Sequence, residues 1–96
     1  MLNVSIVLYH PDWEQVCALT HALLQSQRVN RVYWIDNSPQ AAEQLPLQSE
    51  RIQYQHNPTN LGYGAAHNIA IRESIYDNIP FHLVINPDII LDSKEL

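Results

Sequence analysis

Short apolar runs, each closed by a polar turn signal, recur along this chain and predict four strands. The first three runs are Val4–Tyr9, Val32–Ile35 and Arg51–Gln55, and the fourth begins at Phe81. Runs this short and rich in β-branched residues are typical of strands. The third alternates polar and apolar residues, which favours a strand near an edge of a sheet. The first is almost continuously apolar, as in a strand buried on both faces.

The last run, Leu83–Ile85, stops at Asn86-Pro87-Asp88 and predicts a buried strand that ends there. Pro87 has no N–H to give to a strand ladder, so it closes the strand. The carboxylate of Asp88 would then lie just beyond the carboxyl end of the strand. The alternative is an Asn-Pro-Asp turn between two strands, and this segment alone favours that alternative.

Two helices are predicted between the strands, because apolar residues there recur at helical spacing. The first begins around Pro11 and runs to about Gln27. It carries two neighbouring stripes: Trp13, Cys17 and Leu24, then Val16, Leu19 and Leu23. The second runs from about Gly64 to Tyr76, and the residues that share one face are Gly64, Asn68, Ile71 and Ile75. Small residues in its first turns would let it approach a sheet closely. We expect a loop at Gln40–Glu50.

Helices between strands imply parallel pairs, so the predicted fold class is α/β with a doubly wound, mostly parallel sheet, a Rossmann-like nucleotide-binding half. The carboxyl ends of parallel strands lie along one edge, where such sheets bind ligands. A polar cluster follows every strand: Tyr9 and His10, Asp36 and Asn37, Asn57 and Asn60, and Asn86 and Asp88. This shared edge is the predicted functional site.

Composition narrows the class of protein. The chain has 96 residues, enough for one domain, and 46% are hydrophobic, so a packed core is expected. Five Lys and Arg and a formal net charge of −5 argue against a nucleic-acid partner. Cys17 is the one cysteine, which predicts no internal disulfide and fits a reducing compartment. With no signal peptide and no apolar run long enough for a membrane span, we expect a soluble cytoplasmic domain.

The polar edge suits a nucleoside diphosphate. Backbone N–H groups at Gly62–Ala66, where a helix starts, could bind phosphate. Few cations lie nearby, so a divalent Mg²⁺ or Mn²⁺ held by Asp88 could neutralise the diphosphate. Asp36 could accept a hydrogen bond from a base or a ribose, and Tyr9 could stack on the base. No glycine follows the first strand and no P-loop is present, which excludes the usual dinucleotide and NTPase motifs.

Simpler interpretations remain open for these residues. Asp36 could only cap a turn, and Gly62 and Gly64 could only allow close helix packing. Cys17 is better explained as a small buried side chain than as a nucleophile. The five histidines never fall at metal-ligand spacing, which argues against zinc.

Four motifs, in order, resemble the amino-terminal part of family-two glycosyltransferases with the GT-A fold, closest to bacterial rhamnosyltransferase-like members. They are V-S-I-V-L-Y-H from Val4, W-I-D-N-S from Trp34, N-P-T-N-L-G-Y-G-A-A-H-N-I-A-I from Asn57, and N-P-D from Asn86. The resemblance covers essentially the whole chain. Its most specific part is Asn60-Leu61-Gly62 with Gly64 and Asn68.

The resemblance implies a role for each motif. Tyr9 and Asp36 would hold the nucleoside of a sugar-nucleotide donor, and Asn60 to Asn68 would shape the donor pocket. Asp88 would be the last residue of the family's D-x-D motif and would reach the metal. Asn86 stands where many members have a carboxylate, so it would act through water or toward the sugar. The N-P-D variant looks like that of deoxysugar transferases, which suggests a dTDP-rhamnose-type donor, with a UDP-sugar as the other option.

The family carries its acceptor site and general base well downstream of the D-x-D motif. The resemblance therefore implies that residues 1–96 form a single nucleotide-sugar-binding domain, an incomplete GT-A domain with no catalytic base of its own. The full inverting enzyme would transfer a sugar to a saccharide or lipid-linked acceptor in lipopolysaccharide-type synthesis, at the inner face of the membrane. Two other classes stay open: a non-catalytic binding module, and a structural α/β domain that forms a homo-oligomer through exposed apolar surface.

Overall fold

Four strands and two helices follow one another in the predicted order. The computed structural model describes residues 1–87. The elements are β1 (Leu2–Leu8), α1 (Trp13–Leu24), β2 (Val29–Asp36), β3 (Ile52–His56), α2 (Tyr63–Tyr76) and β4 (Phe81–Ile85). The segment between β2 and β3 forms no helix or strand, as predicted for Gln40–Glu50.

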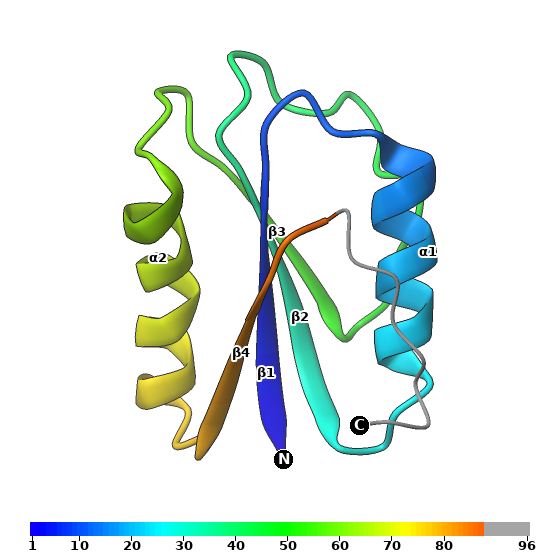
Figure 1. Cartoon of the computed structure of the whole chain (residues 1–96), viewed down its shortest axis with the longest axis vertical. Coiled ribbons are helices and arrows are strands. Elements are labelled where there is room, and N and C mark those ends of the chain that lie inside the picture. Colours follow the sequence, from blue (N-terminus) through cyan, green and yellow to red (C-terminus); the bar gives the residue numbers. More distant parts are fainter. Residues whose placement is uncertain (88–96) are drawn as a thin grey trace.

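The strands form one sheet in the order β3-β2-β1-β4, and every neighbouring pair is parallel. Helices α1 and α2 lie on opposite sides of this sheet, and the loops after β1, β2 and β3 gather at one end (Figure 1). The predicted α/β class and parallel sheet are therefore confirmed. The architecture is compatible with a Rossmann-like half-domain.

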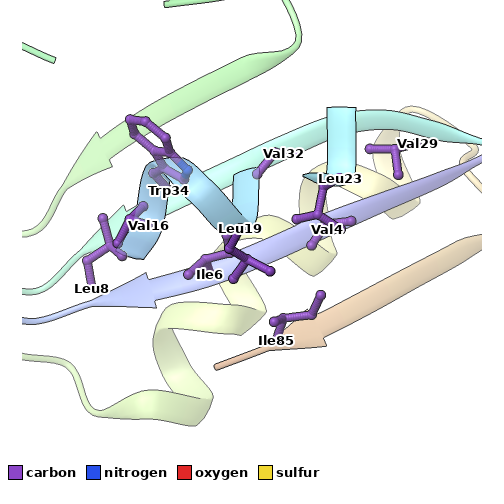
Figure 2. Close-up of a cluster of buried hydrophobic side chains, with 10 residues drawn as sticks. All are labelled: Val4, Ile6, Leu8, Val16, Leu19, Leu23, Val29, Val32, Trp34 and Ile85. Carbon is purple, nitrogen blue, oxygen red and sulfur yellow. The ribbon is translucent and has the colours of Figure 1, made fainter. Parts of the chain in front are cut away.

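The main hydrophobic core lies between the sheet and α1. β1 turns Val4, Ile6 and Leu8 toward this side, where they meet α1 and Trp34 of β2 (Figure 2). One of the two predicted stripes is fully buried: Val16, Leu19 and Leu23. The other, Trp13, Cys17 and Leu24, packs around its margin. From Asn3 to Leu8 every residue of β1 is buried, as expected for a strand that is covered on both faces.

The start of α1 differs slightly from the prediction. Asp12 is the N-cap, and its Oδ1 accepts a hydrogen bond from the backbone N–H of Gln15 at 3.3 Å. Pro11 therefore precedes the cap instead of forming the first helical turn. The negative charge of Asp12 lies at the positive end of the helix dipole, which stabilises it there.

The face that α2 turns to the sheet is not the predicted one. Its buried residues are Ala66, His67, Ala70 and Ser74, whereas Ile75 is 70% exposed. Both alanines are completely buried and belong to the smaller hydrophobic cluster between α2 and the sheet. The two polar residues are buried because β1 places Asn3 and Ser5 on the same side as hydrogen-bond partners.

The prediction of a buried strand at Leu83–Ile85 is wrong for its middle residue. β4 is an edge strand of the sheet formed by residues 1–87, and Val84 is 46% exposed. Leu83 and Ile85 do contact the α1-side core. An edge strand has a neighbour on one side alone, so an apolar run in it is not covered as fully as in β1. β3, at the other edge, alternates in burial as predicted.

Candidate functional site

The polar segments after β1, β2 and β3 meet at one edge of the sheet. The backbone N–H of Asn37 donates to the carbonyl of Leu8 at 2.8 Å, and that of Asn57 donates to the carbonyl of Asp36 at 2.8 Å. These bonds continue the parallel ladders past the ends of the strands. The residues that follow the three strands are thereby held side by side, as the parallel topology predicts.

Asn37 joins this edge to the loop that leads into α2. Its Nδ2 donates to Oδ1 of Asn60 and to the carbonyl of Gly62, both at 3.2 Å. Its Oδ1 accepts from Nδ2 of Asn57 at 3.0 Å. The Oδ1 of Asn60 also accepts from the backbone N–H of Gly62 at 2.9 Å. The predicted site residues Asn60 and Gly62 are thus fastened to the end of β2.

Asn37 and Asn57 are themselves nearly fully buried, at 3% and 7% exposure. Sequence reasoning placed both on the rim but did not count them among the site residues. Their position in the sequence could have identified them, because each comes directly after the last residue of a strand. Buried amides need hydrogen-bond partners, and at this edge they find one another.

Asp36 lies at the end of β2 and is 1% exposed. Its Oδ1 accepts from the backbone N–H of Ser38 at 2.9 Å, so the carboxylate does cap a turn. Its Oδ2 accepts from the hydroxyl of Tyr54 at 2.6 Å, and that hydroxyl accepts from the backbone N–H of Ala42 at 3.1 Å. Burial and then the neighbouring Asp36 raise the pKa of Tyr54 to about 12. Each carboxylate oxygen has two lone pairs, so Asp36 can still accept from a ligand.

A pocket of about 340 Å³ lies between the β1–α1 loop and the residues that follow β2. Its lining combines a carboxylate, two aromatic rings and small polar groups: His10, Pro11, Trp13, Asp36, Ser38, Gln40 and Ala42. Ligand pockets in proteins typically span about 300–1,000 Å³. The volume of this pocket is therefore at the small end of the usual range.

His10 has the left-handed φ of 47° that a side chain rarely adopts. Its backbone N–H donates to Oγ of Ser38 at 2.8 Å, and Nε2 of His56 is 2.8 Å from the carbonyl of Ser38. The first contact holds the β1–α1 loop against the segment that follows β2, and the second joins the end of β3 to the same segment. Tyr9 lies beside the pocket lining instead of in it: the ring is 55% exposed and edge-on to His10 at 4.4 Å between centroids.

The start of α2 has the open character expected of an anion site. Gly62 is its N-cap, at a φ of 82°, and no side chain caps the helix. A Cβ built on Gly62 or Gly64 would meet nothing within 4 Å. Close packing of the described chain therefore does not explain either glycine. Gly64 and Asn68 are both exposed in the first turns of the helix.

Asn86 is exposed just past the end of β4, and its Oδ1 accepts a hydrogen bond from the hydroxyl of Tyr63 in α2. This contact joins the fourth strand end to the first turn of α2. Asp88, the predicted metal ligand, lies outside the described residues. Within residues 1–87, no group of three or more His, Cys, Asp or Glu side chains is arranged to hold a metal ion.

No protein-family model, curated protein or solved structure matches this chain. Neither α1 nor α2 is long and apolar enough to cross a membrane, and residues 1–87 contain no other helix.

Proposed function

We propose that this chain is the donor-binding part of a glycosyltransferase that uses a nucleotide-diphosphate sugar. The observation that carries the proposal is the pocket at the carboxyl ends of β1 and β2, with the buried carboxylate of Asp36 in its wall. In parallel α/β sheets ligands bind in this location. The order of the four motifs in the sequence supplies the choice of ligand.

In this proposal the pocket holds the base. A uracil or thymine ring has an N–H between two carbonyl groups, and Asp36 is a pure acceptor for such a donor. Trp13 and His10 offer ring surfaces beside it. Tyr9 is exposed next to His10, from where its ring can cover the nucleoside. A dTDP- or UDP-sugar is therefore the proposed donor.

The diphosphate and the sugar would extend from the pocket toward α2. The backbone N–H groups after Gly62 are the proposed phosphate contacts, because the positive end of a helix dipole favours an anion. Gly64 and Asn68 would border the donor on the exposed side of the first turns. Asn86 would face the sugar. The Asn37 amide positions this loop without touching the donor.

A divalent Mg²⁺ or Mn²⁺ bound by Asp88 stays a prediction. The described residues do not assemble a metal site, so no step of the reaction is derived through a metal. The proposed contribution of residues 1–87 is to bind and orient the donor. The general base and the saccharide or lipid-linked acceptor belong to the proposed full enzyme.

Titration calorimetry of the chain with dTDP and with UDP tests the proposal. We expect binding that Asp36→Asn weakens at least tenfold, because an amide both loses the charge and presents a donor to the base N–H. Asp12→Asn is the matched control, since it changes an exposed N-cap carboxylate to another good cap residue. A folded wild-type chain that binds neither nucleotide would refute the proposal.

The exposed edge of the sheet favours a second candidate function, a structural domain that self-associates. Phe81 and Val84 of β4 are 68% and 46% exposed on an edge strand. Edge strands with apolar side chains tend to pair with other chains. Sedimentation velocity distinguishes the candidates: a stable oligomer that binds no nucleotide and dissociates in Val84→Lys supports the structural class.

A further inference from the structure

A chain of hydrogen bonds lies buried between α2 and the sheet. Nδ2 of Asn3 donates to Oγ of Ser74 at 2.9 Å, and Oγ of Ser74 is 2.7 Å from Nδ1 of His82. Nε2 of His82 is 2.8 Å from Oγ of Ser5, which is 2.7 Å from Nδ1 of His67. Ser5 is completely buried and His67 is 3% exposed. One serine of β1 thus bridges a histidine of α2 and a histidine of β4.

Ser5 limits the number of protons that this chain of hydrogen bonds can hold. Its hydroxyl has a single proton, so it donates to one imidazole and accepts from the other. With both histidines neutral, the chain can run in either direction. In both directions Nε2 of His67 is the open end, because it is buried and has no hydrogen-bond partner.

One added proton can enter without breaking a bond. His82 then donates from both nitrogens, to Ser74 and to Ser5, and Ser5 donates to His67. A second proton leaves N–H groups on both sides of Ser5. Two cations would then share one hydroxyl oxygen, the proton of Ser5 would lose its acceptor, and the Nε2–H of His67 would stay unpaired. Buried charges without partners are strongly destabilising.

Among residues 1–87, the groups that surround the two histidines include no carboxylate that could compensate the second charge. β1 contributes the amide of Asn3 and the hydroxyl of Ser5, and α2 contributes Ser74 and the ring of Tyr63, which lies edge-on to His67 at 4.5 Å between centroids. The neighbouring strand β2 contributes neutral groups, Asn30 through its bond to Asn3, and Tyr33.

Three charged side chains lie close to this side of the sheet. Arg31, Asp77 and Glu73 all influence the phenol of Tyr33, and in residues 1–87 no carboxylate forms an ion pair or hydrogen bond with either imidazole. Burial lowers the pKa of His67, and the charge of His82 lowers it further. Burial also lowers the pKa of His82.

We propose that His67, Ser5 and His82 form an acid-sensitive latch that holds α2 on the sheet while the histidine pair carries at most one proton. When the second proton binds, the bridge breaks and α2 is released. Because α2 begins at the polar edge of the sheet, its release also disorders the loop around its N-cap, Gly62. The latch depends only on the buried hydrogen bonds of His67, Ser5 and His82. The proposal is therefore independent of whether the polar edge of the sheet binds a nucleotide.

Urea unfolding followed by circular dichroism at pH values from 7.5 to 5.0 tests the latch. Unfolded histidines titrate near pH 6.5, whereas the folded pair binds protons at lower pH. Stability is therefore complete above about pH 6.5 and falls as the pH drops below it. Each proton bound by the unfolded chain alone raises the unfolding constant about tenfold per pH unit. The unfolded chain binds up to two protons on these histidines as the pH falls, and the folded pair binds at most one. We therefore expect the unfolding constant to rise by about tenfold or more between pH 6.0 and 5.0.

His67→Asn keeps a polar group near Nδ1 but cannot titrate, so we expect its slope to fall by about one proton. His21→Gln, on the exposed surface of α1, is the matched control. It should not reduce the slope of the free energy of unfolding against pH. An equal slope in wild type and His67→Asn would overturn the latch. If His67→Asn does not fold, ¹⁵N NMR of the wild-type imidazoles decides. Both rings becoming doubly protonated near pH 6.5 with unchanged α2 amide signals would also overturn it.

Discussion

The hydroxyl of Tyr54 donates to Oδ2 of Asp36 at 2.6 Å and, through its other side, accepts from the backbone N–H of Ala42. One phenol thus connects the edge strand β3, the end of β2 and the long loop between them. Asp36 and Ala42 both line the pocket. Tyr54 therefore positions two residues of the pocket wall, although it does not line the pocket itself.

Tyr54→Phe is expected to lower the free energy of unfolding by roughly 1.5–3 kcal/mol, the usual range for a hydrogen bond to a charged group. Urea unfolding at neutral pH measures the loss. Tyr76→Phe is the matched control, because Tyr76 is 84% exposed, and it should be nearly neutral. Equal stability of the two variants would show that the Asp36 contact contributes nothing.

The same contact predicts a response to alkaline pH. The pKa of Tyr54 is raised to about 12, whereas an unfolded tyrosine ionises near pH 10. The neutral phenol therefore contributes stability that is complete below about pH 10 and is lost as the pH rises toward 12. Unfolding curves across this range should show a steeper loss in wild type than in Tyr54→Phe. Parallel curves would contradict the raised pKa.

The two glycines at the start of α2 should respond oppositely to alanine. Gly62 has a φ of 82°, so Gly62→Ala should destabilise the chain by roughly 1–2 kcal/mol. Gly64 lies inside the helix with nothing within 4 Å of a new Cβ, so Gly64→Ala should stabilise it by about 0.5–1 kcal/mol. Thermal unfolding measures both changes. Destabilisation by Gly64→Ala would mean that the helix start is packed more closely than described.

Gly64→Ala also tests the proposed donor site without a loss of folding. If the donor diphosphate lies against the first turn of α2, a methyl group there should weaken dTDP or UDP binding while stability rises. Calorimetry on the variant and the wild type gives the comparison. Unchanged affinity would place the diphosphate away from Gly64.

Asn37→Ala removes the amide that joins Asn57, Asn60 and Gly62. It leaves the Nδ2 of the buried Asn57 without its acceptor, so the expected loss is about 1–3 kcal/mol. Hydrogen exchange should accelerate in the loop before α2 while β1 stays protected. Asn68→Ala, at an exposed helix position, is the control and should leave exchange in that loop unchanged. Exchange that rises equally in all strands would show that Asn37 stabilises the whole fold and not this loop.

Periodicity predicted the elements well because it reflects local geometry. Alternation in Arg51–Gln55 correctly indicated an edge strand. Of the two neighbouring stripes predicted in α1, the one formed by Val16, Leu19 and Leu23 is buried. The same method failed for α2. There the apolar Ile75 is exposed, and the polar His67 and Ser74 are buried.

The amino-acid sequence by itself determined the order of strands and helices, the parallel α/β class and the set of polar residues that follow the strands. The spacing of hydrophobic residues and the turn residues are local properties, so they can be interpreted without knowing which distant residues they contact. The tertiary structure alone decided that His67 faces Ser5, that Tyr54 binds Asp36 and that His10 lines the pocket in place of Tyr9. Each of these depends on which side chain lies opposite across the sheet, and a buried polar group is stable wherever such a partner satisfies it.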